Sequence, residues 1–108
     1  MESLKDVLRR AMEEKKMSIR KLEAAIGSEL KQEQKVSRNL IHEYLSGKRA
    51  PTYKAAAAIS DVLELNKKEF LLLTFYTRQE QRKASEKERF LEYCRAAGIK
   101  VTGKDLKE

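Results

Sequence analysis

The strongest constraint on the fold of this chain is an apolar spacing of three and four residues. The spacing first occurs near the start of the sequence, where the apolar residues share one face of a predicted helix. These residues are Leu4, Val7, Leu8, Ala11 and Met12. The same spacing returns in later segments, whereas strand-like alternation lasts only over residues 99–102. The pattern predicts an all-α protein with five or six helices.

Capping residues lie at the expected ends of the predicted helices. Serine and asparagine side chains cap helices well, and a Glu three positions later completes a capping box. The predicted caps are Ser3, Ser18, Ser37, Asn66 with Glu69, and Ser85 with Glu88. Gly27, Gly47 and Gly98 stand where a left-handed turn would end the preceding helix. Pro51 and Thr52 open a segment with four consecutive alanines, which predicts a helix packed closely against its neighbours.

The composition agrees with a small helical protein. The chain has 108 residues, which suits one domain with an appended element. It has no Trp, and Gly and Pro total five, the sum of 4 and 1. The segment after Gly103 predicts a flexible tail.

The charge and the remaining residue types limit the function. A net charge of +7 favours a polyanionic partner such as nucleic acid, although many small proteins are basic without one. No metal-ligand spacing, phosphate loop or nucleophile paired with a base is present, so we expect neither an enzyme nor a cofactor. The single Cys94 fits a reducing cytoplasm and a packing role. We expect no signal peptide and no membrane-spanning segment.

Three segments carry a resemblance to a known family. VSRNLIHEYLSGKRAP has a small cap, polar residues, an apolar pair, Gly-Lys-Arg and Pro. MSIRKLEAAIG precedes it, and PTYKAAAAISDVLEL follows it. In this order the segments, within residues 4–73, resemble the Cro/C1-type (XRE-like) helix-turn-helix family of bacterial and phage repressors. The resemblance implies a lambda-repressor-like domain of four to five helices, here with an added C-terminal helix. It also implies a sequence-specific regulator of transcription that binds double-stranded DNA in the bacterial or phage nucleoid.

The helix between Ser37 and Gly47 carries the predicted base contacts. Its apolar residues point inward, which leaves Arg38, Asn39, His42 and Glu43 outward or at the flank. Arg can bind guanine O6 and N7, Asn can bind adenine N6 and N7, and Glu can accept from cytosine N4. The resemblance places the principal base contacts on Arg38, Asn39 and Glu43. An ordinary solvated helix face is the alternative, and His42 is the weakest of the four predictions.

The predicted phosphate contacts surround this helix. They are Arg20, Lys31, Lys35, Ser37, Ser46, Lys48 and Arg49. Arg20 is included because Ile19 stands where the family commonly has a phosphate-contacting Gln. Lys31 and Lys35 lie in residues 28–35, an extension of the helix-turn-helix turn relative to the family. The extension is either a solvent-exposed insertion or a segment that lies along the DNA backbone.

The last third of the chain predicts an association surface. We divide the chain into a DNA-binding domain at 1–76, a C-terminal helical extension at 77–102 and a tail at 103–108. Because one helix-turn-helix covers only a half-site, we expect a homodimer on an inverted repeat. The candidate contacts are Phe75, Tyr76, Phe90 and Leu91. Alternatively, the last helix folds back on its own domain, or the chain is a protein-interaction module such as an antitoxin that binds a partner through its C-terminal helices.

Overall fold

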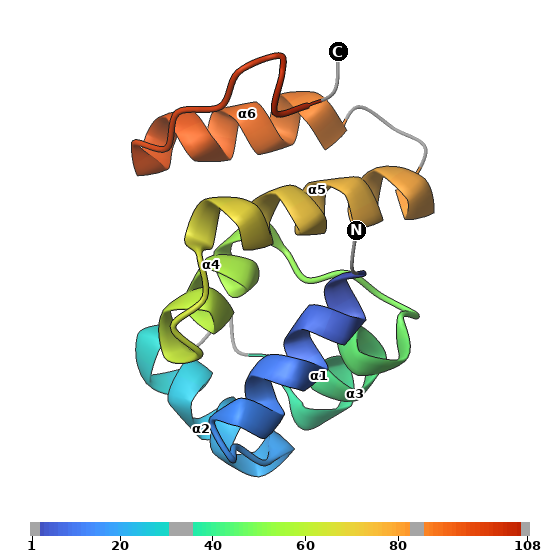
Figure 1. The fold of residues 1–108 in the computed structure, drawn as a ribbon, viewed down its shortest axis with the longest axis vertical. Helices are drawn as coiled ribbons and strands as arrows, with labels where there is room; N and C mark the ends of the chain where they lie inside the picture. The colour runs from blue at the N-terminus through green and yellow to red at the C-terminus, as the bar shows by residue number, and fades with distance from the viewer. Residues whose placement is uncertain (1–2, 31–35, 83–85, 107–108) are drawn as a thin grey trace.

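A computed structural model of the chain describes residues 3–30, 36–82 and 86–106. Its helices are α1 (Leu4–Glu14), α2 (Ile19–Glu29), α3 (Arg38–Ser46), α4 (Tyr53–Val62), α5 (Lys67–Arg82) and α6 (Glu86–Ala97). The all-α prediction is confirmed, and the described residues contain no strand. Helices α1 to α4 gather on one side of α5, and α6 lies along the opposite side (Figure 1).

Capping side chains start five of the helices, four of them at the predicted residues Ser3, Ser18, Ser37 and Asn66. The hydroxyls of Ser3, Ser18, Ser37 and Thr52 each accept a hydrogen bond from the backbone N–H three residues later. Asn66 does the same for the N–H of Glu69 at 2.9 Å. Each cap satisfies a donor that the first helical turn leaves without an intrahelical partner. The capping box predicted at Ser85 lies outside the described residues.

The end of α2 differs from the prediction. Gly27 was expected to end this helix, but α2 continues to Glu29 and only Gly47 and Gly98 among the described glycines have positive φ. The reason lies in the apolar spacing: Leu22, Ile26 and Leu30 repeat every four residues, and Leu30 packs against the core. A helix held by such a face tolerates the cost of an internal glycine.

The core forms where α4 crosses the centre of the domain. Ala55, Ala56, Ala57 and Ala58 are all buried, and Ala56 is fully so. Small side chains let α4 approach α2 and α5 closely, as the four alanines predicted. Leu22 and Ile26 of α2 are fully buried on the same cluster.

Helix α6 folds back onto α5, which corrects part of the predicted dimer surface. Phe75 and Phe90 are 2% and 0% exposed. Their rings stack on each other with 4.9 Å between centroids. They therefore belong to the core of the monomer and are not available as contacts with a second subunit. Tyr76 and Leu91 remain partly exposed.

Residues 102–106 also pack on α5. The Tyr76 hydroxyl donates to the backbone oxygen of Asp105, and Lys68 of α5 lies 3.0 Å from the Asp105 carboxylate. Thr102 donates its backbone N–H to the same carboxylate at 2.9 Å. These contacts differ from the free tail expected after Gly103, and the segment lies beside α6 in Figure 1.

Candidate nucleic-acid interface

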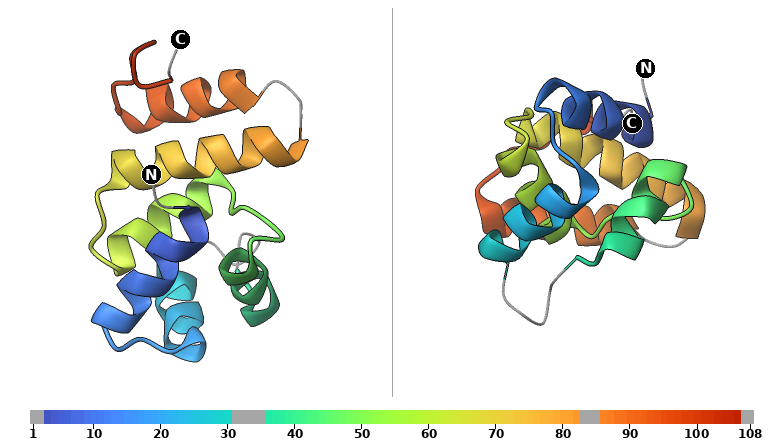
Figure 2. Two further views of the ribbon diagram at one scale, coloured as in Figure 1. Left: turned by 45° about the vertical axis from the view of Figure 1, so that its right-hand side comes forward. Right: turned by 90° about the horizontal axis from the view of Figure 1, so that it is seen from below.

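Helix α3 presents one buried face and one exposed face. Ile41 and Tyr44 are buried in the core, and burial raises the pKa of the Tyr44 phenol above its ordinary value. The opposite face exposes Arg38, Asn39 and His42. The predicted separation of inward and outward residues is therefore present, and three of the four predicted base contacts share the free face of the helix. Figure 2 shows α3 at the edge of the helical group, beside α2.

Glu23 of α2 joins the two helices at the first turn of α3. Its carboxylate accepts the Arg38 backbone N–H at 2.9 Å. The second carboxylate oxygen lies 3.4 Å from the Arg38 guanidinium. With Ser37 capping Leu40, the first turn of α3 is held by one hydroxyl and one carboxylate. This contact was not predictable from local sequence patterns, because Glu23 and Arg38 are fifteen positions apart along the chain.

A shallow hollow lies at the same end of α3. It is lined by Glu23, Ser37, Arg38, Asn39 and His42. The polar groups around it include donors from Arg and Asn and an acceptor from Glu. Such a set can exchange hydrogen bonds with the edges of bases or with phosphate oxygens.

Glu43 and Arg49 form an ion pair at the other end of the helix. Arg49 Nε lies 3.1 Å from a Glu43 carboxylate oxygen. The guanidinium is largely exposed, with 62% of the Arg49 side chain accessible, whereas Glu43 is less accessible at 38%. A predicted base contact is thus paired with a predicted phosphate contact, and the exposed Arg49 is better placed to meet DNA than Glu43.

The turn after α3 is a fixed structure. Gly47 adopts φ of +83°, and the N–H groups of Lys48 and Arg49 lie 3.0 and 3.4 Å from the Glu43 carbonyl oxygen. Lys48 and Arg49 expose their side chains beside the free face of α3. Ser46 is exposed as well, but its hydroxyl donates to the Glu43 carbonyl at 3.0 Å.

Two side chains far away in the sequence hold this end of α3. Arg9 of α1 donates to the Leu45 carbonyl at 3.1 Å. Gln81 of α5 donates to the Gly47 carbonyl and accepts the Ala50 N–H, each at 3.2 Å. The sequence pattern did not predict either contact, since each joins residues more than thirty positions apart.

The other predicted phosphate contacts are dispersed. Arg20 is exposed in the first turn of α2, where Ile19 is partly buried. Lys31 and Lys35 lie outside the described residues. Of residues 28–35, Ser28 and Glu29 are helical, so the extension of the turn is shorter than the sequence predicted.

The structure also bears on metal-binding groups and on membrane-spanning helices. The described residues contain no group of three or more His, Cys, Asp or Glu that could hold a metal ion. Within those same residues, no helix has the length and apolar character needed to cross a bilayer.

Comparison with known proteins agrees with this geometry. The family model described as helix-turn-helix matches residues 8–70, which include α2, α3 and the turn after α3. The chain has no match among curated proteins and none among solved structures. Since the match covers more than half of the sequence, the chain belongs to the Cro/C1-type helix-turn-helix family, a non-enzymatic family of DNA-binding proteins.

Proposed function

We propose that the chain is a sequence-specific transcriptional repressor that binds an inverted repeat in double-stranded DNA as a homodimer. The observation that carries the proposal is the free face of α3. It exposes Arg38, Asn39 and His42 next to the cationic turn of Lys48 and Arg49. In the helix-turn-helix arrangement the N-terminal residues of the second helix contact base edges in the major groove. Repression would follow from occupation of the operator.

The two groups of residues have different roles in this proposal. Arg38 and Asn39 supply selectivity through bidentate contacts to guanine and adenine. Lys48, Arg49 and the more distant Arg20 supply binding to phosphates, which does not depend on sequence. If about six phosphates are contacted, affinity falls roughly a thousandfold between about 50 and 200 mM salt.

Selection of bound duplexes from a random pool tests the proposal. The wild-type protein should enrich an inverted repeat, and Arg38→Ala/Asn39→Ala should lose that enrichment while still binding duplex DNA. Arg95→Ala is the matched control, because it removes the same charge from the exposed side of α6. Absence of enrichment by the folded wild-type protein would contradict the proposal and favour the protein-interaction alternative.

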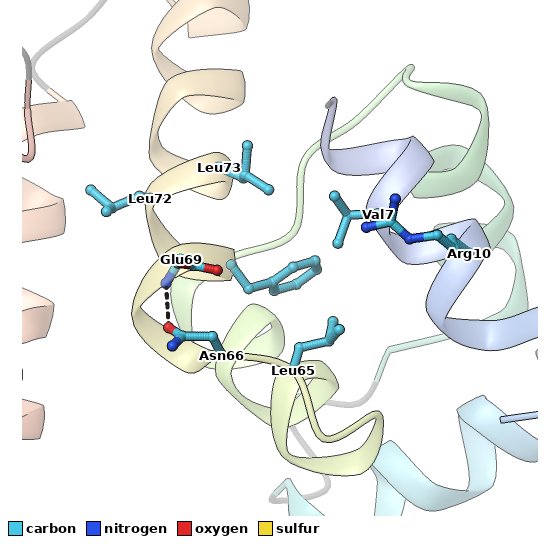
Figure 3. A pocket seen from close by; sticks show the side chains of 8 residues that line it. Val7, Arg10, Leu65, Asn66, Glu69, Leu72 and Leu73 are labelled. Atoms are coloured by element: carbon cyan, nitrogen blue, oxygen red, sulfur yellow. Dashed lines mark hydrogen bonds between the residues drawn. The ribbon is translucent and has the colours of Figure 1, made fainter. Parts of the chain in front are cut away.

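The proposed dimer needs an apolar surface other than the buried pair Phe75 and Phe90. A hollow between α1 and α5 supplies one: Val7 faces Leu65 and Leu73 across it (Figure 3). Arg10 and Glu69, which carry opposite charges, also line it. A two-fold contact places the same patch on both subunits, so a patch carrying both charges can complement itself.

Variants at two partly exposed leucines test this surface. We expect Leu73→Asp to shift the protein towards a monomer in sedimentation at micromolar concentration. Leu91→Asp on α6 should leave the oligomeric state unchanged. The reverse result would move the interface to α6, and a monomeric wild-type protein, with and without DNA, would exclude the dimer.

A further inference from the structure

The turn that carries Lys48 and Arg49 is held by residues beyond the family domain. The family match ends at residue 70, whereas Arg78, Gln81 and Glu86 follow it. Gln81 forms two hydrogen bonds of 3.2 Å with the turn, to the Gly47 carbonyl and the Ala50 N–H. The second half of α5 is therefore a support for the turn after α3.

Arg78 extends the same support one helical turn earlier. Its guanidinium donates to the Pro51 carbonyl at 3.2 Å and lies over the Tyr53 ring at 5.4 Å. Together, Arg78 and Gln81 bind both ends of the segment 47–51. Three backbone groups of that segment are thus bonded to side chains of a rigid helix.

Helix α6 fixes Arg78 in turn. Glu86 is 2% exposed and accepts from Arg78 Nε at 2.5 Å. It also accepts a hydrogen bond of 3.3 Å from the Tyr53 hydroxyl. Burial of the Tyr53 phenol, and then the negative charge of the adjacent Glu86, raise the pKa of Tyr53 well above its ordinary value, so the phenol remains a donor. An ion pair with so little exposure is held in one geometry, unlike a pair on the surface.

We propose that Gln81, together with Arg78 as fixed by Glu86 of α6, positions the 47–51 turn so that Lys48 and Arg49 meet DNA phosphates. This inference rests on the proposed function. The C-terminal extension would then contribute to DNA binding without touching DNA. Its contribution would be equal for all sequences, because phosphate contacts carry no sequence information.

The experiment measures binding of a fluorescein-labelled duplex of random sequence by anisotropy over a series of salt concentrations. Gln81→Ala should weaken binding about three- to tenfold and lower the salt slope by about 1, the size of one lost phosphate contact. Gln79→Ala is the matched control, since Gln79 is exposed on the same helix. Thermal unfolding of each variant checks that the fold is retained.

A second background separates positioning from general destabilisation. In Lys48→Ala/Arg49→Ala protein, Gln81→Ala should have no further effect, because the cations it positions are gone. An equal loss in both backgrounds, or a Gln81→Ala protein that binds like Gln79→Ala, would overturn the positioning role while leaving the proposed function intact. A folded wild-type protein that does not bind the duplex would overturn both.

Discussion

Two glycines, one inside α2 and one at the end of α3, should change the stability of the protein in opposite directions when replaced by alanine. Gly47 ends α3 with φ of +83°, in the left-handed region, whereas Gly27 lies inside α2 without positive φ. An ideal Cβ on Gly27 meets no atom within 4 Å apart from its chain neighbours and the backbone of its own helix, and one on Gly47 lies 3.3 Å from Lys5 Cδ. Backbone conformation therefore decides both outcomes, since the Lys5 side chain can move aside.

The magnitudes follow from the conformation at each position. Left-handed backbone costs an L-residue roughly 1–2 kcal/mol, so Gly47→Ala should lower the free energy of unfolding by that amount. Gly inside a helix is roughly 0.5–1 kcal/mol worse than Ala, so Gly27→Ala should stabilise the protein. With about 4–8 °C in Tm per kcal/mol for a domain near this size, the expected shifts are about −4 to −16 °C and about +2 to +8 °C.

Thermal unfolding followed by circular dichroism measures both shifts under one set of conditions. The pair also tests the observed end of α2. If Gly27 were the left-handed residue expected from the sequence, Gly27→Ala would destabilise the protein as Gly47→Ala does. A loss of stability in both variants would refute the continuation of α2 to Glu29.

Three further predictions concern charged or titratable side chains. Glu23→Gln should keep an acceptor for the Arg38 N–H but remove a negative charge beside the first turn of α3. If that turn meets DNA as proposed, affinity for random duplex should rise by about 0.2–1 kcal/mol in anisotropy titrations, and a decrease would contradict this. Glu86→Ala should lower the free energy of unfolding, measured by urea denaturation, by about 3–5 kcal/mol, because it leaves Arg78 without its nearly buried partner. A loss below about 1 kcal/mol would argue against the buried pair. Burial raises the pKa of the Cys94 thiol, so less thiolate is present at mildly alkaline pH. A thiol reagent should therefore modify Cys94 much more slowly in native than in urea-unfolded protein, and equal rates would contradict its burial.

Local chemistry made the elements of this fold predictable. Ser3, Ser18, Ser37 and Asn66 were identified as caps from residue type alone, and each accepts the expected backbone N–H. Capping depends on groups within one helical turn, so a sequence window contains all the participants. The free face of α3 was predictable for the same reason, because a 3.6-residue period assigns each side chain to a face.

Contacts between distant segments were not predictable in this way. The apolar spacing marks which face of each helix is buried, but it does not say which faces pack on each other. The stacking of Phe90 on Phe75 could therefore not be distinguished from a contact between two subunits. The hydrogen bond from Gln81 to the turn after α3 was not predictable for the same reason, because a polar residue on an exposed helix face gives no indication of its partner. These pairings depend on how the helices pack, and the periodicity of any single helix does not contain that information.

Glu23 shows how a departure from the family pattern can be accommodated. The resemblance to the family implies a small, closely packed residue at this position, and residues 28–35 extend the turn of the helix-turn-helix relative to the family. The entropic cost of a longer connection grows only slowly with its length, but the connection alone would not fix the start of α3. A carboxylate that accepts the Arg38 N–H at 2.9 Å replaces close packing with a direct bond between the two helices. The larger residue is therefore compatible with the longer turn, because Glu23 itself bonds to the first residue of α3.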